Sequence, residues 1–394
     1  MASRPFAVAG AGFAGAVVAR ELAVHTDRRV IVFDERPHVA GNCHTERDEA
    51  TGVMVHRYGS HIFHTDRQDV WEYVNRFMPF RPYIHRVMAN TPRGMFSLPI
   101  NLLTINQFFG KTFSPEEARA FLESLAEKRN GEPANFEEQA LRMVGRELYE
   151  NFFEGYTRKH WGCDPREIPA SVLKRLPVRF NYNDCYYDCV FQGIPEGGYT
   201  ELVRRILEHP RIEVRLAQKF DPAWCGEFEH VFYTGPIDAF FGFRHGRLAY
   251  RTVTFQRHEA RGDFQGTAVI NYTDVRVPYT RVHEYKHFTR WEQHERTVAF
   301  FEFSQDTGPT DIPYYPVRRP DDKARLRHYY ADAVQTRGVS FLGRLATYRY
   351  LDMHQVIAES LDFAATFLAA WHDGTQSLPT FTPTVAGLIA RQQV

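Results

Sequence analysis

Residues 6–22 read FAVAGAGFAGAVVAREL, and this stretch decides the fold. The apolar run over 6–9 predicts a buried strand, and the glycines that follow predict a tight turn into a helix. A second apolar run, Val30–Phe33, ends at Asp34 and completes a strand–helix–strand unit. We therefore expect an α/β fold that begins with a Rossmann-like domain.

The glycines at 10, 12 and 15 have the spacing of a dinucleotide-binding turn. Gly10 permits the tight turn, Gly12 lets the backbone approach a pyrophosphate, and Gly15 allows close helix–strand packing. The helix start offers free N–H groups to phosphate, and Asp34 can accept hydrogen bonds from ribose hydroxyls. The stretch predicts a dinucleotide site. The alternative is a tight turn of an α/β fold that binds no ligand.

The residues beyond Asp34 favour FAD over NAD. Residues 35–42 read ERPHVAGN, which resembles the segment after the second strand in the large flavoprotein family with the glutathione-reductase-like fold. The chain also returns to this domain late, through 233–235 (YTG) and 343–344 (GR). Such late returns are typical of a flavin domain that inserted substrate domains interrupt.

The charge balance argues against nucleic acid or an anionic membrane as a partner. Lys plus Arg number 48 and Asp plus Glu number 48, so no overall field attracts a polyanion. Five scattered cysteines show no disulfide framework, which favours a reducing, cytoplasmic compartment. No apolar run reaches the roughly 18 residues of a membrane span. The apolar start resembles a secretory signal superficially, but glycines at fixed offsets suit the turn better.

Hydrophobic periodicity divides the rest of the chain into helical and strand-rich parts. Helical spacing recurs between about 66 and 153, where 114–117 (SPEE) is a helix-start sequence. Strand-like runs dominate 212–304, and a long helix is expected over 352–372. The fold class is thus a discontinuous Rossmann-like FAD-binding domain with an inserted helical domain and an antiparallel β-sheet domain. The expected bounds are 1–78, 194–238 and 338–375 for the FAD-binding domain, 101–165 for the helical domain, 79–100, 166–193 and 239–337 for the antiparallel-sheet substrate domain, and 376–394 for a tail.

Five separated segments resemble one family, the FAD-dependent UDP-galactopyranose mutases. In the family's order they are 58–65 (YGSHIFHT), 155–162 (GYTRKHWG), 279–281 (YTR), 314–317 (YYPV) and 343–353 (GRLATYRYLDM). The resemblance implies an isomerase that interconverts UDP-galactopyranose and UDP-galactofuranose for cell-wall polysaccharide synthesis, and a homodimer. It also implies that the flavin acts when reduced, with N5 attacking the anomeric carbon and displacing UDP.

The matched motif positions imply a set of site residues. Expected catalytic residues are Arg175 and Arg281, which bind the diphosphate, and His61 near the flavin edge. Expected substrate contacts are Tyr156, Thr157, Trp161, Tyr186, Asn271, Tyr315, Tyr350, His64 and His85. Expected FAD contacts are Gly10, Gly12, Phe13, Ala14, Gly15, Asp34, Glu35, Asn42, His61, Gly235, Arg344, Tyr350, Asp352 and Met353.

The resemblance also gives these residues particular roles. Tyr156 would stack on uracil, and the hydroxyls of Tyr186, Tyr315 and Tyr350 would donate to the diphosphate. Arg175 follows a segment similar to the family's mobile lid, so it would arrive when substrate binds. Without the resemblance, aromatic residues at these spacings more often belong to a core.

Residues 283–287 (HEYKH) match the HExxH zinc motif but lack its context. The motif needs a helix that places both histidines on one face. Residues 280–288 follow Pro278 and alternate as a strand does, so we expect Glu284 opposite His283 and no metal. Cys185 and Cys189 lack partners at zinc spacing, so no metal is expected there either.

The segment 181–195 (NYNDCYYDCVFQGIP) departs from the family pattern at Cys185 and at 189–190. Tyr186 is retained, so the phosphate contact is expected to survive while the sugar pocket differs. Another nucleotide sugar, UDP-N-acetylgalactosamine or a deoxyhexose, therefore stays open as the substrate. From other classes, an amine-oxidase-like oxidoreductase would consume oxygen and need no reductant. A degenerate flavoprotein would bind a partner without catalysis, and the pair Arg175 and Arg281 argues against it.

Overall fold

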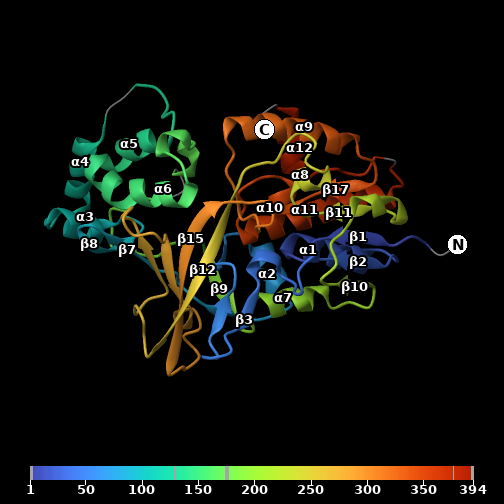
Figure 1. Cartoon of the computed structure of the whole chain (residues 1–394), viewed down its shortest axis with the longest axis horizontal. Helices are drawn as coiled ribbons and strands as arrows, with labels where there is room; N and C mark the ends of the chain where they lie inside the picture. The colour runs from blue at the N-terminus through green and yellow to red at the C-terminus, as the bar shows by residue number, and fades with distance from the viewer. Residues whose placement is uncertain (1–2, 128–129, 174–176, 376, 392–394) are drawn as a thin grey trace.

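A computed structural model describes residues 3–127, 130–173, 177–375 and 377–391. Its first unit is built on a five-stranded parallel sheet (Figure 1). The strand order is β10-β2-β1-β11-β17, formed by Ile212–Arg215, Val30–Phe33, Phe6–Ala9, Val231–Tyr233 and Val339–Phe341. Every pairing in this sheet is parallel. Strands from distant parts of the chain thus share one sheet, and the predicted α/β fold class is confirmed.

Helices cover both faces of the parallel sheet, so its strands are apolar on both sides. One face packs against α1 (Phe13–His25), α2 (Gln68–Asn75), α7 (Gly198–Leu207) and α11 (Met353–His372). The other packs against α8 (Ile237–Phe240), α9 (Pro320–Gln335), α10 (Gly343–Ala346) and α12 (Pro383–Ala390). Within β2, Val30 and Val32 face the first cluster, and Ile31 and Phe33 face the second.

The segment expected as a tail, 376–394, instead packs on the parallel-sheet domain where the structure describes it. Phe381 is paired with Phe341 of β17, and its side chain is buried. The Thr382 side chain then accepts a hydrogen bond from the N–H of Val385 and starts α12. The Thr- and Pro-rich composition indicated a loop. Tertiary burial of Phe381 and Val385 overrides that composition, and Thr followed by Pro is also a helix-start signal.

Replacing Phe381 by alanine is expected to lower the free energy of unfolding by about 3–5 kcal/mol. The Phe381 ring centroid lies 4.9 Å from that of Tyr330 and 5.8 Å from that of Phe341, so truncation leaves a cavity beneath α9. Urea denaturation measures the change. Val334→Ala on the exposed side of α9 is the matched control, expected to shift stability by less than about 0.5 kcal/mol. A loss as small as the control's would contradict this packing.

A second, seven-stranded sheet forms the other half of the molecule. Its order is β16-β12-β15-β14-β13-β7-β8, formed by Tyr315–Pro316, Tyr250–Arg261, Arg296–Asp306, Arg281–Glu284, Val269–Tyr272, Val87–Thr91 and Gly94–Leu98. All neighbours are antiparallel except β13 and β7. The expected antiparallel sheet is therefore mixed. Parallel neighbours need a long connecting segment, and β7 lies far earlier in the chain than β13.

Helices cluster at the end of this mixed sheet, at the left of Figure 1 beside β7 and β8. They are α3 (Leu102–Phe109), α4 (Pro115–Leu125), α5 (Phe136–Leu148) and α6 (Gly155–Trp161), with a π-helical turn at Tyr149–Glu154. The predicted helix start is confirmed: the Ser114 hydroxyl accepts from the N–H of Glu117, whose carboxylate accepts from the N–H of Ser114. None of the described helices combines the length and apolar character that a membrane crossing requires.

Short strands line the junction between the two halves. A two-stranded sheet pairs β3 (Thr45–Arg47) with β4 (Met54–His56). A three-stranded sheet has the order β5-β9-β6, formed by Phe63–Thr65, Phe191–Pro195 and Phe80–Pro82. β5 carries His64, and β9 follows the segment that contains Tyr186. The junction therefore brings several of the predicted site residues together.

Candidate active site

A cavity of about 950 Å³ runs from the first βα turn to the mixed sheet. Its lining takes residues from the ends of β1 and β2, the start of α11, and strands β13 and β14. This volume is at the upper end of the range for small-molecule and cofactor sites, about 300–1,000 Å³. The cavity is therefore large enough for extended ligands that span both halves of the molecule.

The glycine turn at one end of the cavity has three different environments. Gly10 has φ +115°, and a Cβ there would lie 2.1 Å from Oγ1 of Thr234. A Cβ on Gly15 would lie 1.9 Å from the carbonyl oxygen of Gly10. A Cβ on Gly12 would meet only Cα of Gly41, at 4.0 Å. Gly10 and Gly15 thus serve the fold, and Gly12 keeps the backbone open to the cavity.

These glycines allow a matched pair of substitutions. Gly12 has φ −78°, which any residue adopts, so Gly12→Val is expected to fold but to lose most of a bound dinucleotide cofactor. Gly15→Val drives a side chain into the Gly10 carbonyl and is expected to cost about 3 kcal/mol or more of stability. Cofactor content and thermal unfolding, measured on both variants, distinguish the two effects. Full cofactor content in Gly12→Val would exclude the turn from the cofactor site.

Asp34 organises this end of the cavity. Its carboxylate accepts hydrogen bonds from the N–H groups of Ala11, at 2.8 Å, and Arg36, at 2.9 Å. The Arg36 guanidinium donates to Oδ1 of Asn42 and lies over the ring of Tyr58, while its Nη1 is buried without a hydrogen-bond partner. Buried donors without partners are unusual and fit acceptor groups of a bound dinucleotide.

Arg344 also carries buried N–H donors without partners. It lies where the chain returns to the parallel-sheet domain near its end. Nε and Nη2 of Arg344 are buried without hydrogen-bond partners. Its guanidinium lies 4.9 Å from the ring centroid of Tyr315 and 4.6 Å from that of Tyr350, and these two rings stack at 5.6 Å. The aromatic rings hold the cation in place while its N–H groups stay available to a phosphate or to a carbonyl group of a cofactor. The residues present therefore fit a dinucleotide cofactor.

Arg281 reaches the cavity from β14, opposite Glu302 of β15. Nε and Nη2 of Arg281 donate to the two carboxylate oxygens of Glu302 at 2.9 and 2.8 Å. The Glu302 carboxylate also bonds with Oγ1 of Thr280 at 2.8 Å and with Nε2 of His283 at 3.0 Å. Burial alone raises the pKa of Glu302, but Arg281 and His283 more than offset it and hold the pKa well below its ordinary value. Glu302 is thus a fully buried anion that fixes the Arg281 guanidinium in one orientation.

Two histidines, His61 and His85, line the cavity in their neutral form. Burial lowers the pKa of His61 to about 4 and that of His85 to about 3. Nδ1 of His61 lies 2.7 Å from the carbonyl oxygen of Gly59, and the His85 carbonyl accepts from the N–H of Tyr186 at 2.8 Å. Neutral imidazoles place hydrogen-bonding groups at the site without adding positive charge.

Most of the predicted residues meet in this cavity. Its lining includes every expected FAD contact except Gly15, which packs behind the turn. It also includes Arg281 and the expected substrate contacts Tyr186, Asn271, Tyr315, Tyr350, His64 and His85. Arg175 falls outside the described residues.

The structure places three expected substrate contacts elsewhere. Tyr156, Thr157 and Trp161 lie on α6, and among the described residues they are not part of the cavity lining. The Tyr156 ring stacks on that of His160, and His160 contacts the ring of Tyr315. Tyr156 is therefore connected to the cavity through His160 and Tyr315.

Sequence reasoning missed several residues of this site. Tyr187 and His354 line the cavity, and Glu302 holds Arg281. Lys159 donates from Nζ to four carbonyl oxygens of the 272–279 loop, at 2.7–3.0 Å, and so fixes the loop that leads into β14. Tyr187 follows Tyr186, a predicted contact, so its position could have indicated that it belongs to the site. No sequence pattern indicates a role for Glu302, because only strand pairing places it opposite Arg281.

The strand expected over the HExxH match is confirmed for its first half and wrong for its second. Residues 281–284 form β14, and a 3₁₀ turn follows at Tyr285–His287. His283 bonds with Glu302, while Glu284 and His287 face Asp263 on the other side. The two histidines of the motif therefore do not converge as a helix would make them.

Comparison with known proteins gives the family. Residues 151–350 match the family model of UDP-galactopyranose mutase, and 8–77 match an NAD(P)-binding Rossmann-like domain. The chain is 49% identical over 382 residues to a probable UDP-galactopyranose mutase of Klebsiella pneumoniae, covering 97% of this chain and 99% of that one. The chain belongs to the UDP-galactopyranose mutase family. The predicted family is confirmed, and with it the enzyme class, an isomerase.

The chain is also similar to a mutase that is named for another nucleotide sugar, and to solved structures. A dTDP-fucopyranose mutase of Escherichia coli is 47% identical over 368 residues, covering 92% of this chain and 97% of that one. A crystal structure of reduced UDP-galactopyranose mutase matches with a TM-score of 0.74 at 14% identity, over 98% of this chain and all of that one. A putrescine oxidase matches with a TM-score of 0.54 at 11% identity, over 93% and 99%. At such identities the structures show a shared fold only.

Proposed function

We propose that this protein interconverts UDP-galactopyranose and UDP-galactofuranose, with FAD as its cofactor in the reduced state. The observation that supports this most directly is the cavity, which joins a dinucleotide turn to a fixed guanidinium. The 49% identity with the Klebsiella relative supports the same sugar. A reduced flavin, when bound, supplies the nucleophilic nitrogen that the anomeric carbon needs.

The chain's own residues would do the rest by position and charge. The N–H groups around Gly12 and the start of α1 hold a pyrophosphate, and Asp34 binds a ribose. Arg281 meets the negative charge that develops on the departing diphosphate, with Arg175 as its expected partner. Glu302 fixes the Arg281 fork before substrate arrives, so no reorganisation is needed as charge develops.

The tyrosines would act as neutral hydrogen-bond donors. Burial raises the pKa of Tyr315 above its ordinary value, so its hydroxyl stays protonated at neutral pH. Tyr186, Tyr315 and Tyr350 line the cavity and are proposed to donate to the diphosphate. His61 and His64, both neutral, would orient the flavin edge and the sugar. We also propose that the protein is a cytoplasmic homodimer and that its product supplies galactofuranose for cell-wall polysaccharides.

A deoxyhexose linked to dTDP is the second candidate substrate. The E. coli dTDP-fucopyranose mutase is almost as similar to the chain as the Klebsiella relative is, at 47% against 49%. The departures at Cys185 and Cys189 lie in the segment that also holds Tyr186 and Tyr187, both in the cavity lining. A changed sugar pocket is consistent with either sugar.

Anaerobic incubation of the purified protein tests both candidates. UDP-galactofuranose and dTDP-fucofuranose are supplied separately, with and without dithionite, and chromatography separates the nucleotide sugars. We expect conversion of UDP-galactofuranose only when the flavin is reduced. Faster conversion of dTDP-fucofuranose would transfer the assignment to the deoxyhexose. A parallel aerobic assay that shows substrate-dependent oxygen consumption, with no conversion in the anaerobic one, would indicate an oxidoreductase.

A further inference from the structure

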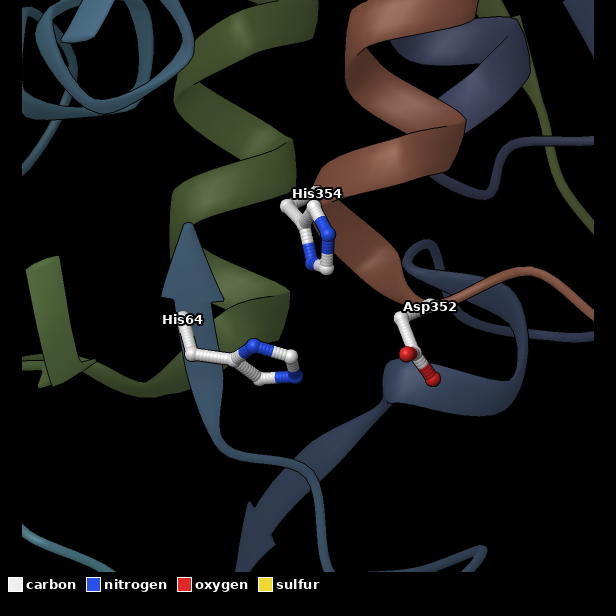
Figure 2. A group of neighbouring side chains, drawn as sticks. All are labelled: His64, Asp352 and His354. Atoms are coloured by element: carbon white, nitrogen blue, oxygen red, sulfur yellow. The ribbon is translucent and has the colours of Figure 1, made fainter. Parts of the chain in front are cut away.

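Two histidines and a carboxylate converge at the edge of the cavity. His64 comes from β5, Asp352 caps the start of α11, and His354 lies in the first turn of that helix. One potential ligand atom from each lies within 4.8 Å of the others. Figure 2 shows the His64 ring extending toward the Asp352 carboxylate, with the His354 ring above the space between them. We call these residues the trio.

The far side of the His64 ring is held by Cys189. Nδ1 of His64 lies 3.2 Å from Sγ of Cys189. The Cys189 thiol is half-buried and forms a hydrogen bond with Asp66. With the S–H directed to Asp66, the sulfur can accept the Nδ1–H of His64. That tautomer leaves the lone pair on Nε2, as in metal-binding histidines whose other nitrogen donates to a neighbour.

His354 supplies a second unused ring nitrogen. Its Nδ1 is buried without a hydrogen-bond partner, and its ring centroid lies 4.7 Å from that of His64. A neutral imidazole keeps a lone pair on one ring nitrogen, which is the form of histidine that binds metal ions. Two neutral imidazoles and one carboxylate give the trio a net charge that suits a divalent cation.

We propose that the trio is a binding site for a divalent transition-metal ion, with Zn²⁺ as the fitting example, and that the bound ion blocks nucleotide-sugar binding. Two histidines and one carboxylate leave a fourth position for water, as in zinc sites with an open coordination position. Zinc bonds of about 2.0–2.2 Å hold tetrahedral ligand atoms roughly 3.4 Å apart, so the side chains close by up to about 1.4 Å when the ion binds. His64 and His354 reach that spacing by rotating their side chains.

The second group of potential ligands in the described chain differs from the trio in its carboxylate and in its surroundings. Asp263, Glu284 and His287 also come within 4.8 Å of one another. However, both carboxylate oxygens of Glu284 already accept hydrogen bonds, from the backbone of 264–266 and from Thr297. The Glu284 carboxylate is therefore engaged in structural hydrogen bonds, whereas the trio lines a cavity. The comparison makes His287 a useful control.

The blocking effect rests on the proposed function, because the trio lines the cavity assigned to the cofactor and nucleotide sugar. An ion at the trio ties up His64 and Asp352, which are expected to contact sugar and flavin. It also places positive charge and bound water where the sugar would enter. We expect the ion to compete with the nucleotide sugar and to leave the protein folded.

Calorimetric titration of the flavin-loaded protein with Zn²⁺ tests binding independently of any activity. We expect one site per chain, with the affinity of His354→Ala lower by at least about 100-fold, because losing even a supporting partner of a metal ligand costs about 10–100-fold. His372→Ala, at the exposed end of α11, and His287→Ala are matched controls expected to bind as the wild type does. Flavin absorbance verifies that each variant folds, and His354→Gln repeats the test if the alanine variant does not. Unchanged affinity in the His354 variants would overturn the site.

Steady-state kinetics tests the blocking effect. In the wild type, Zn²⁺ is expected to raise the apparent KM at least tenfold with little change in kcat, and a chelator restores the original KM. In His354→Ala the ratio of KM with and without Zn²⁺ is expected to approach one. Zn²⁺ binding with an unchanged KM would overturn the blocking role. If neither nucleotide sugar is converted without metal, the proposed function fails, and the calorimetry still decides the site.

Discussion

Arg281→Ala is expected to lower kcat by about 100- to 1,000-fold while the protein still binds flavin. The guanidinium reaches the cavity from β14, and both of its bonded nitrogens are held by Glu302. The departing group is a diphosphate, so removing a fixed cation raises the barrier where negative charge develops. Nothing in this substitution touches the glycine turn, so the cofactor end of the cavity is preserved.

Two further variants separate charge from geometry at this position. Arg281→Lys keeps the charge but loses the planar fork, so an intermediate loss of kcat is expected. Arg276→Ala removes an exposed arginine paired with Asp274 in the preceding loop and is expected to leave kcat unchanged. Single-turnover kinetics and flavin content are measured on all three. A rate near that of the wild type in Arg281→Ala would remove this residue from the catalytic set.

Arg175→Ala is the parallel test of the residue that lies outside the described chain. The family resemblance implies a second phosphate-binding arginine at this position, so we expect a similar fall in kcat. If Arg175→Ala were inactive and Arg281→Ala were active, Arg281 would have only a structural role, at the pairing of β14 with β15.

Glu302→Ala is expected to lower the free energy of unfolding by about 3–5 kcal/mol, because it leaves the half-buried Arg281 cation without its counter-charge. Glu302 is fully buried and bonds with Arg281, His283 and Thr280 at once. Urea denaturation measures the loss. Glu213→Ala is the matched control: Glu213 pairs with two arginines but is exposed, and such pairs contribute about 0–1 kcal/mol. Equal losses in the two variants would contradict the burial argument.

The same carboxylate gives the fold a defined sensitivity to acid. The folded pKa of Glu302 lies below its ordinary value of 4.5, so its stabilising contribution is complete above that pH and is lost as the pH falls below it. In Glu302→Gln this loss cannot occur. The stability gap between wild type and Glu302→Gln is therefore expected to narrow from about pH 6 to about pH 3.5. A gap that stays constant over this range would show that Glu302 is not ionised in the folded protein.

Local sequence determined the cofactor end of the molecule. The turn at 10–15 and the acid at 34 lie within one strand–helix–strand unit, where short-range sterics and hydrogen bonding dictate the backbone. The helix start at Ser114 is equally local, because the capping box closes within three residues. The motif order gave the family, and the comparisons confirm it.

Tertiary structure alone decided the rest of the site. Glu302 meets Arg281 only because β14 and β15 pair in one register, and His64 meets His354 only because β5 lies beside the start of α11. The same holds for the last segment, whose composition indicated a tail until the burial of Phe381 and Val385 ordered it. Such contacts join residues far apart in the chain, and their free energy comes from packing and desolvation that no local pattern encodes. The sequence therefore determined which ligand class this chain accommodates, and the fold decided which charges face that ligand.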